Sequence, residues 1–210
     1  MHIPDGYLSP TTIVVSYAVT LPLWIYGFKK LKEKLNEKTL PLIGSLTALS
    51  FIIMMLNVPI PGGTSGHALG TALISILFGP WIAFISISLV LLIQAVIFGD
   101  GGISALAIES FAMGFVASFV AYYVFKLLKN KKFAPFIAGY LSIVVASFII
   151  ALALGIQPIF WRNNNPLYFP FDLKVTIPAI VGSHIVAFGL VEGILTQLLY
   201  NFLTKKEENE

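Results

Sequence analysis

The chain contains no cysteine, which excludes disulfide bridges, thiolate metal ligands and a cysteine nucleophile. Charged residues are also scarce. They make up 11% of the 210 residues, against about 25% in a typical soluble domain, whereas 57% of the residues are hydrophobic. This composition is typical of a polytopic membrane protein. We therefore predict a single all-α integral membrane domain in a lipid bilayer.

The sequence also lacks the common catalytic motifs. It has no G-x-x-x-x-G-K-[ST] phosphate loop, no H-E-x-x-H zinc motif and no nucleophile elbow, so it is expected neither to hydrolyse ATP nor to act as an enzyme. Only two acidic residues, Glu109 and Glu192, lie well inside apolar stretches. A self-sufficient proton-coupled carrier would line its path with more acidic or histidine side chains. These absences favour a membrane subunit that partner proteins drive.

Seven apolar stretches are separated by polar, basic or Pro/Gly-rich segments. They cover residues 11–28, 40–58, 67–78, 81–98, 105–128, 134–156 and 177–203. The third stretch is only about 18 Å long as a helix, against a hydrocarbon core of about 30 Å. It is expected to cross where other helices bury it or where the bilayer thins.

The positions of the basic residues decide the topology. Eleven of the thirteen lie in three runs, at 29–38, 126–132 and 205–206. With seven spans all three runs share the cytoplasmic face, and only Arg162 and Lys174 lie outside. The positive-inside rule therefore favours about seven transmembrane helices, with the N-terminus outside and the C-terminus cytoplasmic. Residues 1–28 then contain the N-terminal tip and one helix, and residues 40–203 contain the other six.

The first two residues can chelate a metal ion. A free Met1 amine, the His2 backbone nitrogen and His2 Nδ1 would close a five-membered and a six-membered ring on one cation. No basic signal-peptide region precedes the apolar stretch. Nitrogen donors in one plane suit Ni(II) or Cu(II) and suit Zn(II) poorly. A Met-His start by itself is also compatible with no function.

A fourth nitrogen for this plane is offered by His67, which ends the segment PIPGGTSGH. The predicted topology places this segment on the same outer face as the N-terminus. His67 is expected at the start of a helix, with Thr64 or Ser65 as N-cap. The helix dipole would disfavour imidazolium there and favour the neutral imidazole that binds metals. The hypothesis is a metal site built from Met1, His2 and His67.

Four further residues are candidates to support these ligands. Asn57 and Ser65 flank the loop and would orient His67, although capping alone explains Ser65. Glu109 lies near the outer end of its span and would hydrogen-bond a ligand or offset the charge of the cation. His184 is either a satisfied core residue or a group near the pocket.

Other conspicuous residues have simpler explanations. Glu192 is predicted to be a structural hydrogen-bonding group or a subunit contact. Asp100 stands between glycines, where turn formation is the default explanation. Gly44 and Ala48 form a small-xxx-small pair, either for packing within the chain or as a contact for a coupling subunit. The loop aromatics are predicted to lie at the membrane interface, with a lid over the metal as the alternative; they are Phe160, Trp161, Tyr168, Phe169 and Phe171.

Four segments carry a resemblance to a known family: MHIPDGYLSP at the start, NVPIPGGTSGHALG at 57–70, FGDGGISAL at 98–106 and HIVAFGLVEGILT at 184–196. With them the chain resembles the nickel and cobalt substrate-binding membrane subunits of energy-coupling-factor transporters, the CbiM/NikM family. The resemblance implies metal bound by the Met1 amine, the His2 backbone nitrogen and side chain, and His67. One departure is Glu109, which stands where the family typically has asparagine.

The resemblance also implies partners: a transmembrane coupling subunit, two ATPase subunits and often a small companion membrane subunit, with no nucleic acid. The location is the cell membrane of a prokaryote, and the metal is cargo rather than a catalytic cofactor. We expect high-affinity capture of Ni(II), or alternatively Co(II), for uptake. Two other functions remain open: a membrane scaffold or sensor with an incidental N-terminal histidine, and an intramembrane enzyme that uses His184 and Glu192.

Overall fold

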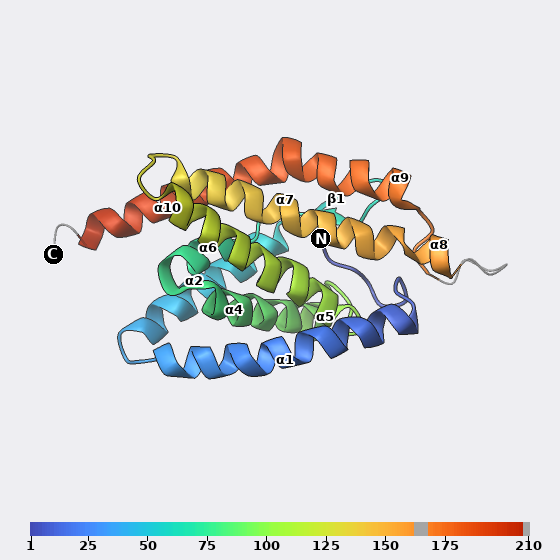
Figure 1. Ribbon diagram of the computed structural model, residues 1–210, viewed down its shortest axis with the longest axis horizontal. Helices are drawn as coiled ribbons and strands as arrows, with labels where there is room; N and C mark the ends of the chain where they lie inside the picture. Colours follow the sequence, from blue (N-terminus) through green and yellow to red (C-terminus); the bar gives the residue numbers. More distant parts are fainter. Residues whose placement is uncertain (162–167, 208–210) are drawn as a thin grey trace.

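The computed structural model describes residues 1–161 and 168–207, except the side chains of residues 206 and 207. Arg162, one of the two basic residues predicted outside, lies outside the described residues. The long helices run roughly along the long axis of the molecule, and the N-terminus lies near its middle (Figure 1). The N-terminal segment therefore reaches into the helical bundle rather than extending away from it.

The elements follow one another as nearly straight helical segments joined by short connections. The first half contains α1 (Pro10–Lys34), α2 (Thr39–Met55), β1 (Val58–Pro59), β2 (Ser65–Gly66), α3 (Thr71–Phe78), α4 (Pro80–Ile93) and the π-helix η1 (Gln94–Phe98). The second half contains α5 (Leu106–Glu109), η2 (Ser110–Val116), α6 (Ala117–Leu128), α7 (Ala134–Gly155), α8 (Gln157–Phe160), α9 (Leu173–Thr176), η3 (Ile177–Val181), η4 (His184–Phe188) and α10 (Gly189–Glu207). The two short strands pair antiparallel, with Val58 opposite Gly66.

The predicted all-α membrane class is confirmed. Five helical segments of the described chain are long and apolar enough to cross a membrane: Pro10–Lys34, Pro80–Phe98, Leu106–Leu128, Ala134–Phe160 and Leu173–Lys205. Helix α2, with 17 residues, and α3, with eight, are shorter. The seven predicted stretches thus all contain helix, while seven membrane crossings and the orientation of the termini stay predictions.

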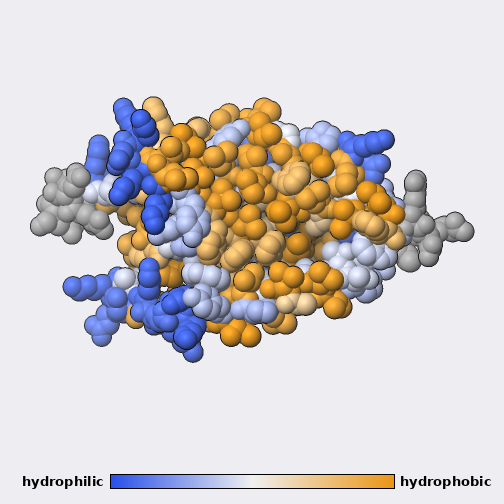
Figure 2. Space-filling view, in the orientation of Figure 1, coloured by the Kyte–Doolittle hydropathy of each residue, from blue (hydrophilic) through white to orange (hydrophobic). Residues whose placement is uncertain are grey.

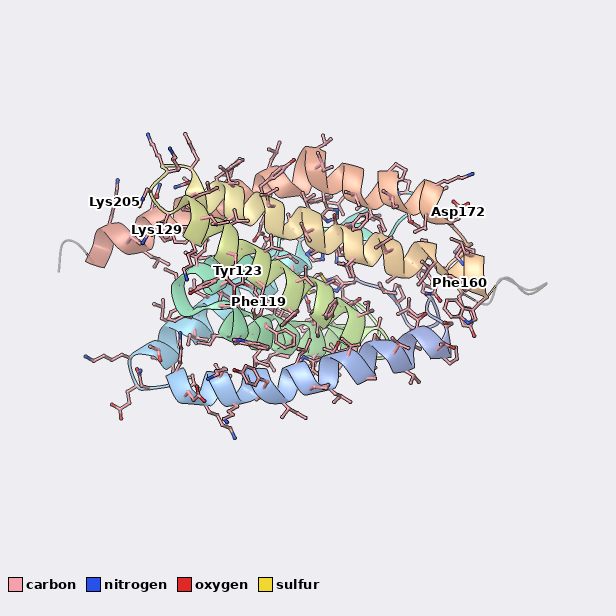
Figure 3. All side chains as sticks on the ribbon, in the orientation of Figure 1. Phe119, Tyr123, Lys129, Phe160, Asp172 and Lys205 are labelled. Atoms are coloured by element: carbon pink, nitrogen blue, oxygen red, sulfur yellow. The ribbon has the colours of Figure 1, made fainter. Side chains whose placement is uncertain are left out.

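The surface has an apolar belt between two hydrophilic ends (Figure 2). The α1–α2 turn, the α6–α7 turn and the C-terminal end of α10 lie together at one end (Figure 1). Lys129 and Lys205 are at this end, whereas Phe160 and Asp172 are at the other (Figure 3). The fold therefore gathers the predicted basic runs on one side of the belt.

Helix α1 begins where its sequence predicts. Ser9 is the N-cap, and its Oγ accepts a hydrogen bond from Thr12 N at 3.3 Å, while Pro10 occupies the first helical position. Gln157, at the end of the α7 segment, fastens this start to the bundle. Its Oε1 accepts from Ser9 N at 2.9 Å and its Nε2 donates to Thr12 Oγ1 at 3.1 Å. The extra helix is thus fixed at the end from which the N-terminal segment turns inward.

Helix α3 has only eight residues and follows a non-helical segment that ends at Gly70. Lys34 Nζ donates to Phe78 O at 3.1 Å, so α3 ends at the basic end of the molecule. Its first residues, from Thr71 onward, are buried among other helices. This fits the expectation that the short stretch is buried by protein, which non-helical backbone at membrane depth requires.

Glu192 on α10 satisfies the backbone of this extended segment. Its carboxylate accepts hydrogen bonds from Leu69 N at 2.6 Å and from Gly70 N at 3.0 Å. Gly70 has φ +73°, a conformation that suits glycine, and precedes the first residue of α3. The prediction of a structural hydrogen-bonding group at Glu192 is confirmed.

The structure corrects two expectations about local structure. His67 does not lie at a helix start, because α3 begins four residues later and its N-cap position is Gly70 without a side-chain cap. Neither Thr64 nor Ser65 caps a helix; both contact the N-terminal segment instead. The segment between the last two predicted spans, expected as a connection, is helical next to both of them, in α8 and α9.

We predict that Glu192→Ala lowers the thermal midpoint of the detergent-solubilised protein. Removal of the carboxylate leaves two backbone N–H groups without acceptors, at about 1–3 kcal/mol for each buried group. Glu192→Gln keeps one acceptor oxygen and should lose less. The exposed Glu33→Ala is the control. An unchanged midpoint in Glu192→Ala would contradict this role.

Candidate metal site

The first three residues are inserted into the protein and are at most 3% exposed. Backbone contacts hold this N-terminal plug, residues 1–9, from both sides. Gly102 N donates to Ile3 O at 2.8 Å, and Thr64 Oγ1 donates to the carbonyl oxygen of His2. Further along, Phe169 N donates to Tyr7 O at 3.0 Å and the two rings pack 5.4 Å apart. Phe169 is buried, so it covers the plug rather than lying in an interfacial belt.

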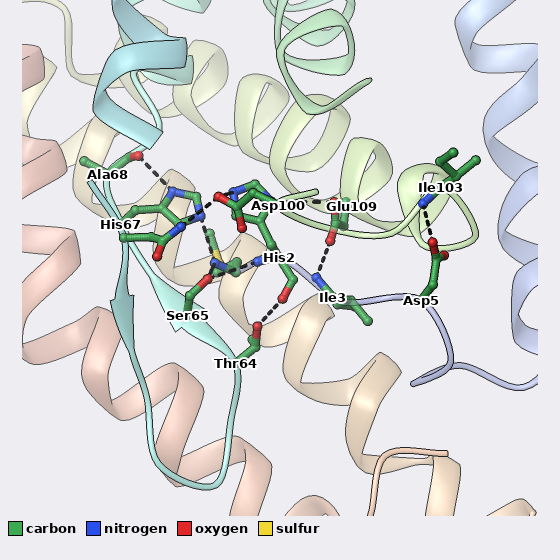
Figure 4. A network of polar contacts seen from close by, with 12 residues as sticks. His2, Ile3, Asp5, Thr64, Ser65, His67, Ala68, Asp100, Ile103 and Glu109 are labelled. Atoms are coloured by element: carbon green, nitrogen blue, oxygen red, sulfur yellow. Dashed lines mark hydrogen bonds and ion pairs between the residues drawn. The ribbon is translucent and has the colours of Figure 1, made fainter. Parts of the chain in front are cut away.

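Asp5 fastens the plug to the loop that precedes α5. Its carboxylate accepts from Ser104 N at 2.8 Å and from the Ser104 hydroxyl. It also accepts from Ile103 N (Figure 4). These bonds, the Ser104 hydroxyl first, lower the pKa of Asp5. A Cβ on Gly102 would lie 2.6 Å from Asp5 N, so only glycine fits here. The plug and the loop at 99–104 therefore form one fitted contact.

The Met1 amine meets His67 inside the protein. Met1 N lies 2.8 Å from His67 Nε2 and donates to Ser65 Oγ at 3.1 Å (Figure 4). His67 Nδ1 lies 3.0 Å from Ala68 O; donation there assigns the imidazole proton to Nδ1 and leaves the Nε2 lone pair facing the amine. Around an ion with metal–nitrogen bonds of about 2.0 Å, neighbouring corners of a square plane are about 2.8 Å apart. The two nitrogens have this spacing.

Burial sets the state of the amine. It lowers the pKa of the Met1 amine to about 5, against the opposing effect of the Glu109 and Asp100 carboxylates. At neutral pH the amine is therefore uncharged and carries a lone pair. An uncharged amine beside an unprotonated imidazole nitrogen offers two donors to one cation.

His2 completes the set of nitrogens. Its ring lies nearly parallel to the His67 ring, with centroids 4.7 Å apart and planes at 16°. Both His2 ring nitrogens are buried and have no hydrogen-bond partner within the described part of the chain. Buried polar atoms are normally satisfied, so such orphaned nitrogens fit a group that binds there. The His2 ring therefore lies beside the His67 ring, which in turn lies beside the Met1 amine.

Glu109 lies against this group of nitrogens. Its Oε1 accepts a hydrogen bond from Ile3 N, and its Oε2 is 3.8 Å from His2 Nδ1. Oε2 is buried and, among the described residues, has no hydrogen-bond partner. Gly101 permits this approach, because a Cβ there would lie 3.1 Å from Oε2 and 3.4 Å from His2 Nδ1. A negative charge is therefore held beside the predicted ligands.

The other predicted supporting residues fall in different places. Ser65 Oγ accepts from the amine and, at 3.4 Å, from His2 N. Asn57 does not orient His67; its Nδ2 donates to Asp100 Oδ2 at 2.7 Å. His184 Nδ1 is 2.7 Å from Ile180 O, and its ring packs on Phe188. Among the described residues, no hydrogen bond or ion pair joins His184 to the nitrogens described above.

The site differs from a side-chain metal centre. In the chain outside residues 162–167 and 208–210, no three His, Asp or Glu side chains are grouped to hold a metal ion. The arrangement instead relies on the amine, a backbone nitrogen and two imidazoles. The structure brings together Met1, His2 and His67, which the sequence analysis had singled out. The sequence analysis missed the contacts of Asp5, Thr64 and Phe169. Asp5 could have been recognised as a carboxylate only four residues after the terminus that was predicted to bind metal.

Gly44 and Ala48 are exposed on α2 and line an apolar groove with residues of α1 and α4, including Leu31 and Leu89. A Cβ on Gly44 would meet no atom within 4 Å. Small residues are therefore not required here by packing within the described chain.

Comparisons with known proteins agree with this architecture. The family model for the cobalt uptake substrate-specific transmembrane region, CbiM, matches residues 2–210. A putative metal transport protein of Methanocaldococcus jannaschii is 42% identical over 98% of this chain and 92% of its own length. A fused nickel transport protein, NikMN, of Rhodobacter capsulatus is 40% identical over 98% of this chain, which spans only 62% of that relative. The crystal structure of a truncated transition metal transporter superimposes with a TM-score of 0.94 at 42% identity, covering 98% of this chain and 99% of that one.

A buried nitrogen-rich site inside a helical membrane bundle defines a metal-handling membrane protein. The chain belongs to the CbiM family, whose members are substrate-specific transmembrane components of nickel and cobalt transport.

We predict that insertion of two alanines between Met1 and His2 abolishes metal binding; a single inserted residue would itself create an X-X-His chelate. The insertion breaks the chelate and moves the amine away from His67 Nε2, because the plug is held by backbone bonds at Ile3. The measurement is nickel content of the purified protein after desalting. Two alanines added after Glu210 are the matched control and should leave the content unchanged. Equal metal in the two variants would refute a terminal-amine ligand.

Proposed function

We propose that this chain is the substrate-binding component of an ATP-driven energy-coupling-factor transporter and that it captures Ni(II) at the outer face of the cell membrane. The observation that carries the proposal is the 2.8 Å approach of the buried Met1 amine to His67 Nε2, beside a His2 ring with two orphaned nitrogens. The four ligands are the Met1 amine, the His2 backbone nitrogen, His2 Nδ1 and His67 Nε2.

The choice of nickel rests on the donor set. Four nitrogens in a plane suit Ni(II), whereas Zn(II) prefers a tetrahedral arrangement. Co(II) is the alternative cargo. Copper would also bind a planar nitrogen site tightly without being the cargo, since Cu(II) forms the strongest complexes in the divalent series. The chain uses the ion as substrate and holds no catalytic cofactor.

Supporting residues act on these ligands from different sides. Ser65 Oγ contacts the Met1 amine and the His2 backbone nitrogen and keeps the amine beside His67. Glu109 places a buried carboxyl group beside His2 and anchors Ile3 N. Asn57 acts through Asp100, and His184 acts through the packing of Phe188 near Gly66.

The proposed topology has seven spans, with the N-terminus outside and the C-terminus cytoplasmic. The gathering of the basic runs at one end of the belt supports it. Residues 1–28 supply the metal-binding tip and extra helix, and residues 40–203 supply the six-helix core. The plug then closes the site from the outer face.

Release of the ion requires that the plug and the His67 segment separate. The chain carries no phosphate-binding loop, so the energy comes from partners: a transmembrane coupling subunit and two ATPase subunits. The fused NikMN relative, of which this chain spans 62%, supports a small companion membrane subunit as a further partner. The exposed Gly44 and Ala48 groove is the proposed contact for the coupling subunit.

We predict that the protein with a free, unextended N-terminus binds one Ni(II) as a yellow, diamagnetic complex. Strong in-plane nitrogen donors pair the electrons of planar Ni(II). Absorption spectroscopy and metal analysis measure this, and His67→Ala should lose the band. His184→Ala is the control and should keep it. A colourless, tetrahedral or multi-site complex would argue for a different metal or no transport role.

We predict that Gly44→Trp or Ala48→Trp prevents co-purification with the coupling subunit while nickel binding persists. The bulky tryptophan ring would fill the groove. The fold should be retained because a side chain at Gly44 enters open space. Leu127→Trp, at an exposed position on α6, is the control. Unchanged co-purification of the groove variants would contradict the proposed contact with the coupling subunit.

A further inference from the structure

Asp100 does not use its side chain to build the turn in which it stands. Gly99 with φ +65° and Gly101 with φ +89° make the turn, and Asp100 N donates to Gln94 O at 3.1 Å. The carboxylate instead accepts from Asn57 Nδ2 at 2.7 Å and lies 3.6 Å from His2 Nε2 (Figure 4). Turn formation explains the glycines but leaves the aspartate unexplained.

The two nitrogens of the His2 ring face two different carboxylates. Nδ1 faces Glu109 Oε2 at 3.8 Å, and Nε2 faces Asp100 Oδ2 at 3.6 Å. Of the two nitrogens only Nδ1 can close a six-membered ring with the His2 backbone nitrogen on one ion. When Nδ1 is the ligand, Nε2 carries the proton. Over residues 1–161 and 168–207 Nε2 has no hydrogen-bond partner, and Asp100 is the only carboxylate paired with it.

We propose that Asp100 is a positioning residue for the metal site: it accepts the Nε2–H of His2, which fixes Nδ1 as the donor and sets the orientation of the ring. The proposal rests on the proposed function, in which His2 Nδ1 is a ligand. A metal-bound histidine usually donates its second N–H to a carboxylate or carbonyl, and this raises the basicity of the ligating nitrogen. A closer approach of about 0.6 Å turns the present separation into an N–H···O bond.

Asn57 makes this contact directional. Asp100 is 23% exposed, so without a second bond its carboxylate would turn toward water. The Asn57 amide holds Oδ2, the same oxygen that faces His2, and thereby keeps the acceptor in place. Asn57 comes from the end of α2 and Asp100 from the loop after η1, so two elements together position one ring of the N-terminal plug.

The position of Asp100 also bears on metal selectivity. A carboxylate on Nε2 makes Nδ1 a stronger donor in the plane of the four nitrogens. A stronger ligand field in this plane favours binding of Ni(II) over Zn(II), because Zn(II) gains no ligand-field stabilisation from planar geometry. Loss of Asp100 is therefore expected to weaken nickel binding more than zinc binding.

The test compares Asp100→Ala, Asp100→Asn and Asn57→Ala with the unchanged protein. Nickel affinity is measured by competition with a chelator, together with the absorption spectrum of the nickel complex and ¹⁵N spectra of histidine-labelled protein. With three histidines in the chain, the ring nitrogen signals are few enough to assign. The expected result for Asp100→Ala is an affinity about 10–100-fold lower, a nickel band at longer wavelength and a shift of the His2 Nε2–H signal. Asp100→Asn keeps an acceptor oxygen and should fall between, and Asn57→Ala should change the same readouts less.

Asp172→Asn is the matched control, since Asp172 is exposed at the start of α9, and all readouts should stay unchanged. Asp100→Ala with unaltered affinity and spectra, while the unchanged protein binds planar nickel, overturns the role of Asp100 and spares the proposed function. A loss of nickel affinity in Asp100→Ala that is seen only at low salt, without a spectral change, also overturns the role of Asp100. Asp100 would then only attract cations. Absence of planar nickel in the unchanged protein rejects the proposed function and this inference together.

Discussion

The structure depends on the burial of a free amino terminus beside an imidazole. A charged ammonium would be costly in this environment, and the loss of the proton turns that cost into a usable donor. The plug is consequently short, held by backbone bonds, and closed by residues from loops that lie far apart in the sequence. Ser65, Thr64, Gly102 and Ser104 all bind residues 1–5.

The position of His67 depends on the non-helical segment before α3. His67 has to reach the N-terminus inside the bundle, and a continuous helix from Val58 onward would carry its backbone along the bundle axis instead. The chain remains extended to Gly70, and a buried carboxylate from α10 satisfies the free N–H groups. The cost of leaving these buried groups outside a helix is thereby limited, and His67 can lie beside the Met1 amine and the His2 ring.

Much of the architecture could be predicted from sequence because hydropathy and basic runs report on the membrane directly. Met1, His2 and His67 could also be predicted, since the donor chemistry is local and histidines are few. The helix start at His67 was wrong because Glu192, more than a hundred residues away, replaces the cap. Asn57 was assigned to His67 and Asp100 to a turn for a similar reason. Their bond joins α2 to the loop after η1, and no local pattern in the sequence encodes such a pairing.

The buried Met1 amine has a consequence for the gene. In the proposed site one ligand is a terminal amine and not a side chain, so no missense change can replace its nitrogen, whereas an N-terminal extension can displace it. The formyl group of initiation has to be cleaved, and the methionine has to be kept; the bulk of His2 favours retention. Translation initiation and its first processing step thus become part of the chemistry of the site.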